Sequence, residues 1–145
     1  MNMLAKSASA EPTRKTLNVV LWIVQLLLAI FFVWAAWTKL FAPSEQLVHM
    51  LPWAAEHPAL VKVTGLVDLA GGLGIILPAL TRITPILGVF AALGLVVLQM
   101  LAMIFHLSRG EAMLVPMNII LLLFATFVLW GRRKAAPITP RTFGA

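Results

Sequence analysis

The sequence has 145 residues, of which 61% are hydrophobic and 11% charged, and its mean hydropathy is +0.99. A soluble domain carries about 25% charged residues, and a chain of this length could not hide so much apolar surface from water. The composition therefore argues against a cytosolic globular enzyme and a disordered chain, and it indicates an integral membrane protein.

The absence of certain residue types excludes several kinds of functional site. The chain has no cysteine and no tyrosine, which excludes disulfides, thiolate metal sites, iron–sulfur ligation and a cysteine nucleophile. The loop histidines His49 and His57 form no HExxH motif, so no metal site is predicted. We assign the net charge of +6 to topology signals near lipid headgroups and not to nucleic acid, because no folded basic domain is available.

Four apolar segments reach the roughly 20 residues that a membrane-spanning helix needs. They cover residues 17–37, 60–80, 83–105 and 113–130. The predicted fold is all-α: an integral membrane four-helix bundle over residues 17–132 that is embedded in the lipid bilayer. The first segment is too long for a signal-peptide core of roughly 7–15 residues, so we expect a retained helix. Segment 1–16 precedes the bundle and the tail 133–145 follows it; we expect the proline-containing residues 135–145 to be mobile.

The three predicted connections differ in length. The second, Thr81-Arg82, is so short that the helices on either side must be antiparallel neighbours, with Pro85 in the first turn of the third helix. The first is a long loop over residues 38–59 that contains three prolines. Within it, Ser44 is expected to cap a short helix over residues 45–51 that rests on the bilayer surface.

The basic residues predict how the bundle is oriented. The side with both termini and the second loop holds eight, namely Lys6, Arg14, Lys15, Arg82, Arg132, Arg133, Lys134 and Arg141. The other side holds three, Lys39, Lys62 and Arg109. Lys and Arg favour the cytoplasmic side, so we expect a multi-pass protein of the plasma (inner) membrane with both termini in the cytoplasm and the long loop outside.

An aspartate lies inside the second predicted helix. Asp68 is about eight residues, or about 12 Å, from the outer end of that helix. An acid at this depth costs about 2.5–3.5 kcal/mol on insertion scales, so it is expected to face the bundle interior or a water-filled cavity. Two interpretations remain open: a proton-carrying or ligand-binding acid, and a buried staple between helices.

Polar side chains on the other helices lie at a similar depth. Gln99 and Asn118 could share an interior site with the aspartate, or each could bond separately to a backbone carbonyl. His106 ends the third helix and is a candidate ligand-binding group at the mouth of such a site. Lys39 and Glu111 are expected on its rim.

Glycines in the second helix predict close helix packing. Gly65 and Gly72 share a face with the aspartate, and Gly74 forms a small-xxx-small pair with Ala70. Small residues at these spacings allow helices to approach closely in lipid.

Several short motifs follow one another in a recognisable order. They are Trp37-Thr38-Lys39-Leu40, the glycine-rich stretch from Gly65 to Gly74, the run from His106 to Glu111, and Pro116 with Asn118. Over about residues 26–132 this pattern resembles the DoxX-like family of small four-helix membrane proteins. The family pattern has glutamate where this chain has Asp68, which keeps the charge and shortens its reach.

The resemblance implies a membrane-embedded bundle and, for some relatives, a subunit of a thiosulfate:quinone oxidoreductase. The sequence carries no haem, flavin or iron–sulfur signature, so a redox role would need a quinone or a redox partner subunit. No catalytic residue is assigned. The function expected is the binding of a quinone-like or small hydrophobic ligand, or a role as the membrane subunit of a redox system. The alternatives are a proton-coupled transporter that works as a homodimer and an assembly protein without a ligand.

Overall fold

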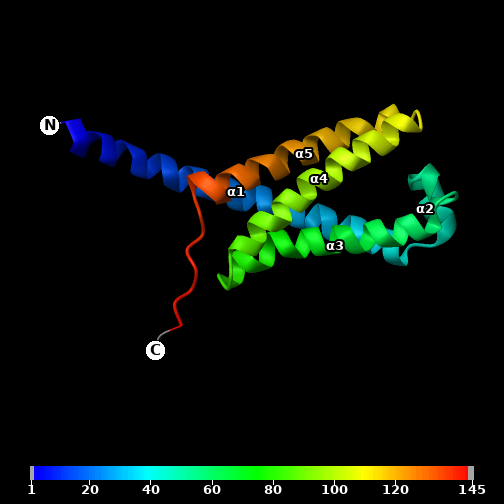
Figure 1. The fold of residues 1–145 in the computed structure, drawn as a ribbon, viewed down its shortest axis with the longest axis horizontal. Helices are drawn as coiled ribbons and strands as arrows, with labels where there is room; N and C mark the ends of the chain where they lie inside the picture. Colours follow the sequence, from blue (N-terminus) through cyan, green and yellow to red (C-terminus); the bar gives the residue numbers. More distant parts are fainter. Residues whose placement is uncertain (1, 144–145) are drawn as a thin grey trace.

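A computed structural model describes residues 2–143, with side chains from residue 13 onward. Its long helices are α1 (Asn2–Phe41), α3 (Pro58–Thr81), α4 (Ile86–Ser108) and α5 (Val115–Trp130) (Figure 1). Shorter helical elements connect or follow them: α2 (Ser44–Met50), η1 (Pro52–Ala54), η2 (Ala112–Leu114) and η3 (Gly131–Ala135). No strand occurs between residues 2 and 143, which confirms the all-α prediction.

Four helical stretches are long and apolar enough to cross a membrane. They are Thr13–Phe41, Pro58–Thr81, Ile86–Ser108 and Ala112–Ala135. The third begins three residues later than the sequence predicted, because Arg82 and Thr84 adopt positive φ angles of 58° and 49° in the preceding turn. Pro85 therefore stands just before α4 and not within its first turn.

The helices form two antiparallel pairs. α1 packs mainly on α3 and α4 mainly on α5, and contacts between α3 and α4 join the pairs. The main core lies where the pairs meet, and its fully buried members include Leu21, Leu28, Ile75, Leu95 and Val128. Figure 1 shows the pairs separating toward the end that carries α2, called here the loop end. The opposite end carries the α3–α4 turn and η3 and is called the basic end.

The outward faces of the four long helices are apolar. Ile30, Leu66, Ile104 and Leu123 are each more than half exposed, one from each of the four helices. Large apolar side chains exposed on every face of a small protein are unfavourable in water and fit contact with lipid.

The short helix that the sequence predicted in the first loop is present as α2, with two corrections. Ser44 is its first residue and makes no side-chain cap, because Pro43 occupies the capping position. The helix is also more than a surface element. Leu47 is buried together with Trp53 and Val61 in a second apolar cluster, so the loop folds inward over the loop end.

The tail is more ordered than expected. Arg82 donates from Nε and Nη2 to the carbonyl and hydroxyl oxygens of Thr139, both at 3.1 Å. The Arg141 backbone N–H donates to the Arg82 carbonyl at 2.9 Å, and Ala136 is buried. The expectation of a mobile tail is therefore wrong for residues 136–141, while residues 144 and 145 lie outside the described part of the chain.

Candidate functional site

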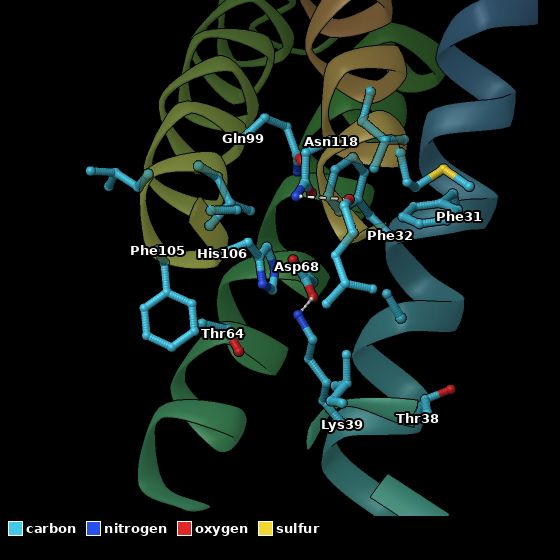
Figure 2. A pocket seen from close by; sticks show the side chains of 18 of the residues that line it. Phe31, Phe32, Thr38, Lys39, Thr64, Asp68, Gln99, Phe105, His106 and Asn118 are labelled. Carbon is cyan, nitrogen blue, oxygen red and sulfur yellow. Dashed lines mark hydrogen bonds and ion pairs between the residues drawn. The ribbon is translucent and has the colours of Figure 1, made fainter. Parts of the chain in front are cut away.

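A cavity of about 470 Å³ lies at the loop end of the bundle. Its wall is mostly apolar and is built by α1, α3, α4 and α5 together with the folded loop. Five of the six polar side chains singled out from the sequence line it (Figure 2): Lys39, Asp68, Gln99, His106 and Asn118. The sixth, Glu111, contacts His106 from outside the wall. Four helices thus bring polar groups to one apolar space.

The acid inside α3 is paired with a base from α1. Lys39 Nζ donates to Asp68 Oδ2 at 2.6 Å, and the two side chains are 18% and 4% exposed. Lys39 lies at the end of α1 where the chain leaves the bundle, so its long stem reaches down to the buried carboxylate. The pair cancels the charge of Asp68, and Lys39 keeps two further N–H donors on the cavity wall.

The two amides on the cavity wall differ in how they are satisfied. Asn118 Nδ2 donates to the Leu114 carbonyl at 3.3 Å, one turn back on its own helix. This is the separate backbone bond that the sequence left open as an alternative. Gln99 Oε1 is buried and has no hydrogen-bond partner. An unsatisfied buried amide oxygen is costly, so a ligand that donated a hydrogen bond to Gln99 would offset this cost.

An ion-pair chain closes the loop end above the cavity. His106 Nδ1 lies 2.8 Å from Glu111 Oε2, and Arg109 Nε donates to Glu111 Oε1 at 3.0 Å. Arg109 also donates from both terminal nitrogens to Glu56, at 2.8 and 3.1 Å. We call these four residues the latch. It ties the α4–η2 turn to the loop before α3, and so links the two helix pairs at the loop end, beside the cavity that His106 lines.

The hydrogen bonds of the latch also determine which nitrogen of His106 carries a proton. A carboxylate only accepts, so His106 donates from Nδ1 and a neutral ring keeps Nε2 as an acceptor on the cavity wall. Burial opposes the charge of Glu111, but hydrogen bonds from His106 and Arg109 prevail and hold its pKa below the usual value. The hydrogen bonds and charge of Arg109 likewise lower the pKa of Glu56.

The predicted packing glycines lie where helices approach closely. A Cβ added at Gly72 would meet the Val33 backbone nitrogen at 3.1 Å and the Ala29 carbonyl oxygen at 3.2 Å. One added at Gly65 would meet the Lys39 Cβ at 3.0 Å. Gly65 and Gly72 therefore set the distance between α1 and α3 and, with it, the reach of Lys39 to its partner. Gly74 faces Ala91 of α4.

Sequence reasoning missed two contributors to the site. Trp53 is 5% exposed, lines the cavity and leaves its Nε1 buried without a partner. Glu56 joins the latch although 53 residues separate it from Arg109. No local sequence pattern indicates the role of either residue, because both roles depend on how the loop folds back over the bundle. The one available signal was the helical spacing of the apolar residues Leu47 and Met50 in α2.

Comparison with known proteins gives a family but no closer relative. No curated protein and no solved structure matches the chain. A model of the DoxX-like family matches residues 23–128, a range that takes in α2, α3 and α4, α1 from Ile23 onward, most of α5, and every residue on the cavity wall. Residues 23–128 are well over half of the sequence, and the chain belongs to the DoxX-like family.

Proposed function

We propose that this membrane protein binds a small, uncharged, mostly apolar ligand with polar oxygen groups, of the quinone class, in the loop-end cavity. The observation that carries the proposal is the Gln99 amide, whose buried oxygen has no partner, on the wall of an apolar cavity of about 470 Å³. Ligand cavities usually measure about 300–1,000 Å³ and combine an apolar wall with a few convergent polar groups.

The polar groups on the wall suit oxygen atoms. Trp53 Nε1 and the free N–H groups of Lys39 can donate to a carbonyl oxygen, whereas Gln99 Oε1 and His106 Nε2 can accept from a hydroxyl. A quinone presents carbonyl oxygens, and its reduced form, the quinol, presents hydroxyl groups. In this proposal Asp68 holds Lys39 in place and is the group that can exchange a proton with it.

Charge on the wall favours a neutral ligand. The Lys39–Asp68 pair has no net charge, and the amide and indole groups have none. An ion would face an apolar wall without a compensating charge, which low-dielectric surroundings disfavour. The arrangement thus supports a neutral ligand better than ion transport. In a redox system the electron donor would belong to a partner subunit.

The test is a titration of the purified protein in mild detergent with decylubiquinone, followed by quenching of tryptophan fluorescence. We expect saturable binding that weakens about five- to tenfold in Gln99→Leu and in His106→Ala, because each loses a hydrogen bond worth about 1 kcal/mol. Met100→Leu is the control, since Met100 is the lipid-facing neighbour of Gln99. Unsaturable quenching, or equal affinity in all variants, would overturn the proposal.

A further inference from the structure

A second polar centre lies at the basic end, away from the cavity. Arg132 lies in η3, where the helical turn widens into a π-helix directly after α5, and it is only 5% exposed. A guanidinium keeps its charge in proteins, so the buried group needs compensation.

The contacts of Arg132 are all with uncharged groups. Nε donates to Gln25 Oε1 and Nη1 to Asn18 Oδ1, both at 2.6 Å, and Nη1 also reaches the Ala136 carbonyl at 3.1 Å. The Trp22 ring lies 5.2 Å from the guanidinium carbon. Among the side chains described from residue 13 onward, no carboxylate pairs with Arg132. Its charge is solvated in part but not neutralised.

The remaining nitrogen of this guanidinium has no partner. Arg132 Nη2 is buried and makes no hydrogen bond. Gln25 Nε2 donates to the Ile75 carbonyl at 2.7 Å, which locks the amide that holds Nε and so fixes the plane of the guanidinium. Hydrogen bonds from Nε and Nη1 hold the guanidinium in place, which leaves Nη2 as a preorganised free donor.

A small cavity adjoins the Arg132 side chain. It measures about 150 Å³ and is lined by Arg132, Arg133, Gln25 and Gly88, among others. The volume is below the range usual for drug-sized ligands and suits a single compact group. Arg133 adds a second positive charge on the same wall and is exposed at the end of the span, where lipid headgroups lie.

We propose that Arg132 and Arg133 form a binding site for a phosphate group at the basic end. The free Nη2 donates to a phosphate oxygen, and Arg133 supplies the second charge; guanidinium groups match phosphate geometry well. The phosphate can belong to an anionic phospholipid headgroup or to free phosphate. Bound there, it neutralises Arg132 and stabilises the contact between α1 and the end of α5.

The experiment measures the melting temperature of the protein in nanodiscs. One series contains phosphatidylcholine alone, a second adds phosphatidylglycerol, and a third adds inorganic phosphate to phosphatidylcholine. We expect at least one of the two additions to raise the melting temperature of the unaltered protein. An effect of phosphatidylglycerol alone identifies a headgroup, and an effect of inorganic phosphate identifies the free anion.

Three variants locate the effect. Arg132→Gln is expected to lose at least half of the shift, while Lys134→Gln keeps it, because exposed Lys134 is not on the cavity wall. Gly88→Leu fills the cavity without removing a partner of Arg132, so it keeps the proposal testable if Arg132→Gln does not fold. An unaltered protein whose melting temperature is the same in all three series, or a full shift in Gly88→Leu, would overturn the proposal.

Discussion

At the level of single residues, the amide of Gln99 is better explained by ligand binding than by a contribution to the stability of the bundle. Its Oε1 is buried without a partner, whereas Asn118 on the same wall bonds to its own helix. A side chain kept only to join helices would be expected to make a hydrogen bond to a neighbouring helix, and the Gln99 oxygen makes none. Gln99 therefore has a cost in the empty protein that a bound ligand can offset.

This cost predicts the effect of Gln99→Leu on the empty protein. Leucine has a similar volume and removes the unsatisfied oxygen, so we expect the free energy of unfolding to stay the same or rise by about 1 kcal/mol. Thermal unfolding in detergent, without added ligand, measures the change. A clear loss of stability would show that the amide holds helices together, contrary to the account.

Because Lys39 and Asp68 form a buried ion pair, we expect substitutions of the two residues to have coupled effects on the free energy of unfolding. Lys39→Met leaves the Asp68 carboxylate almost fully buried without a counter-charge, so we expect a loss of about 3–5 kcal/mol. Adding Asp68→Asn should recover part of that loss, because the uncompensated charge is then gone. The four-member double-mutant cycle, followed by unfolding in detergent, measures the coupling. Additive losses would contradict a direct interaction.

Counting residues from helix ends was enough to predict that Asp68, Gln99 and Asn118 lie at one depth, because helical rise is regular. It could not predict which amide stays unpaired. That outcome depends on side-chain rotamers in the folded bundle. The contributions of Trp53 and Glu56 were also out of reach, since they come from a loop whose path depends on tertiary packing.

At the scale of helices, the spacing between α1 and α3 is set by glycine. We expect Gly72→Ala to destabilise the protein by about 1–3 kcal/mol, because the new methyl group meets the α1 backbone, which cannot move aside as a side chain can. Gly94→Ala is the matched control, since a Cβ there meets nothing within 4 Å. Melting temperatures in detergent test both; equal values for the two variants would contradict this assignment.

The helical elements show where sequence periodicity suffices and where it fails. Apolar length alone predicted four spans, and the short helix after Ser44 in the first loop was also predicted. The predicted first residue of α4 was wrong, because Arg82 and Thr84 adopt left-handed backbone conformations that arginine and threonine rarely adopt. The ordered tail was missed because Thr139 bonds to Arg82, 57 residues away.

At the scale of the whole molecule, the latch joins the two helix pairs at the end where they separate. The pKa values of Glu56 and Glu111 are lowered in the fold, so their stabilising effect is present above their usual pKa of about 4.5. It is lost as the pH falls through the lowered folded-state values.

We therefore expect Glu111→Gln to lower stability by about 1 kcal/mol at pH 7. The difference from the unaltered protein should shrink as the pH falls below about 4.5, where the carboxylate of the unaltered protein is progressively protonated as well. Melting temperatures of both proteins between pH 7 and pH 3 measure this. Parallel curves over the whole range would contradict a charged role for Glu111.

Native mass spectrometry from mild detergent can detect a small neutral ligand held in the loop-end cavity. We expect one small apolar adduct per chain on the unaltered protein. Ala102→Phe, which fills the cavity from its wall, should lose the adduct, and the lipid-facing Met100→Leu should keep it. A chain that carries no such adduct, even after incubation with decylubiquinone, or an adduct that persists unchanged in Ala102→Phe, would contradict ligand binding in this cavity.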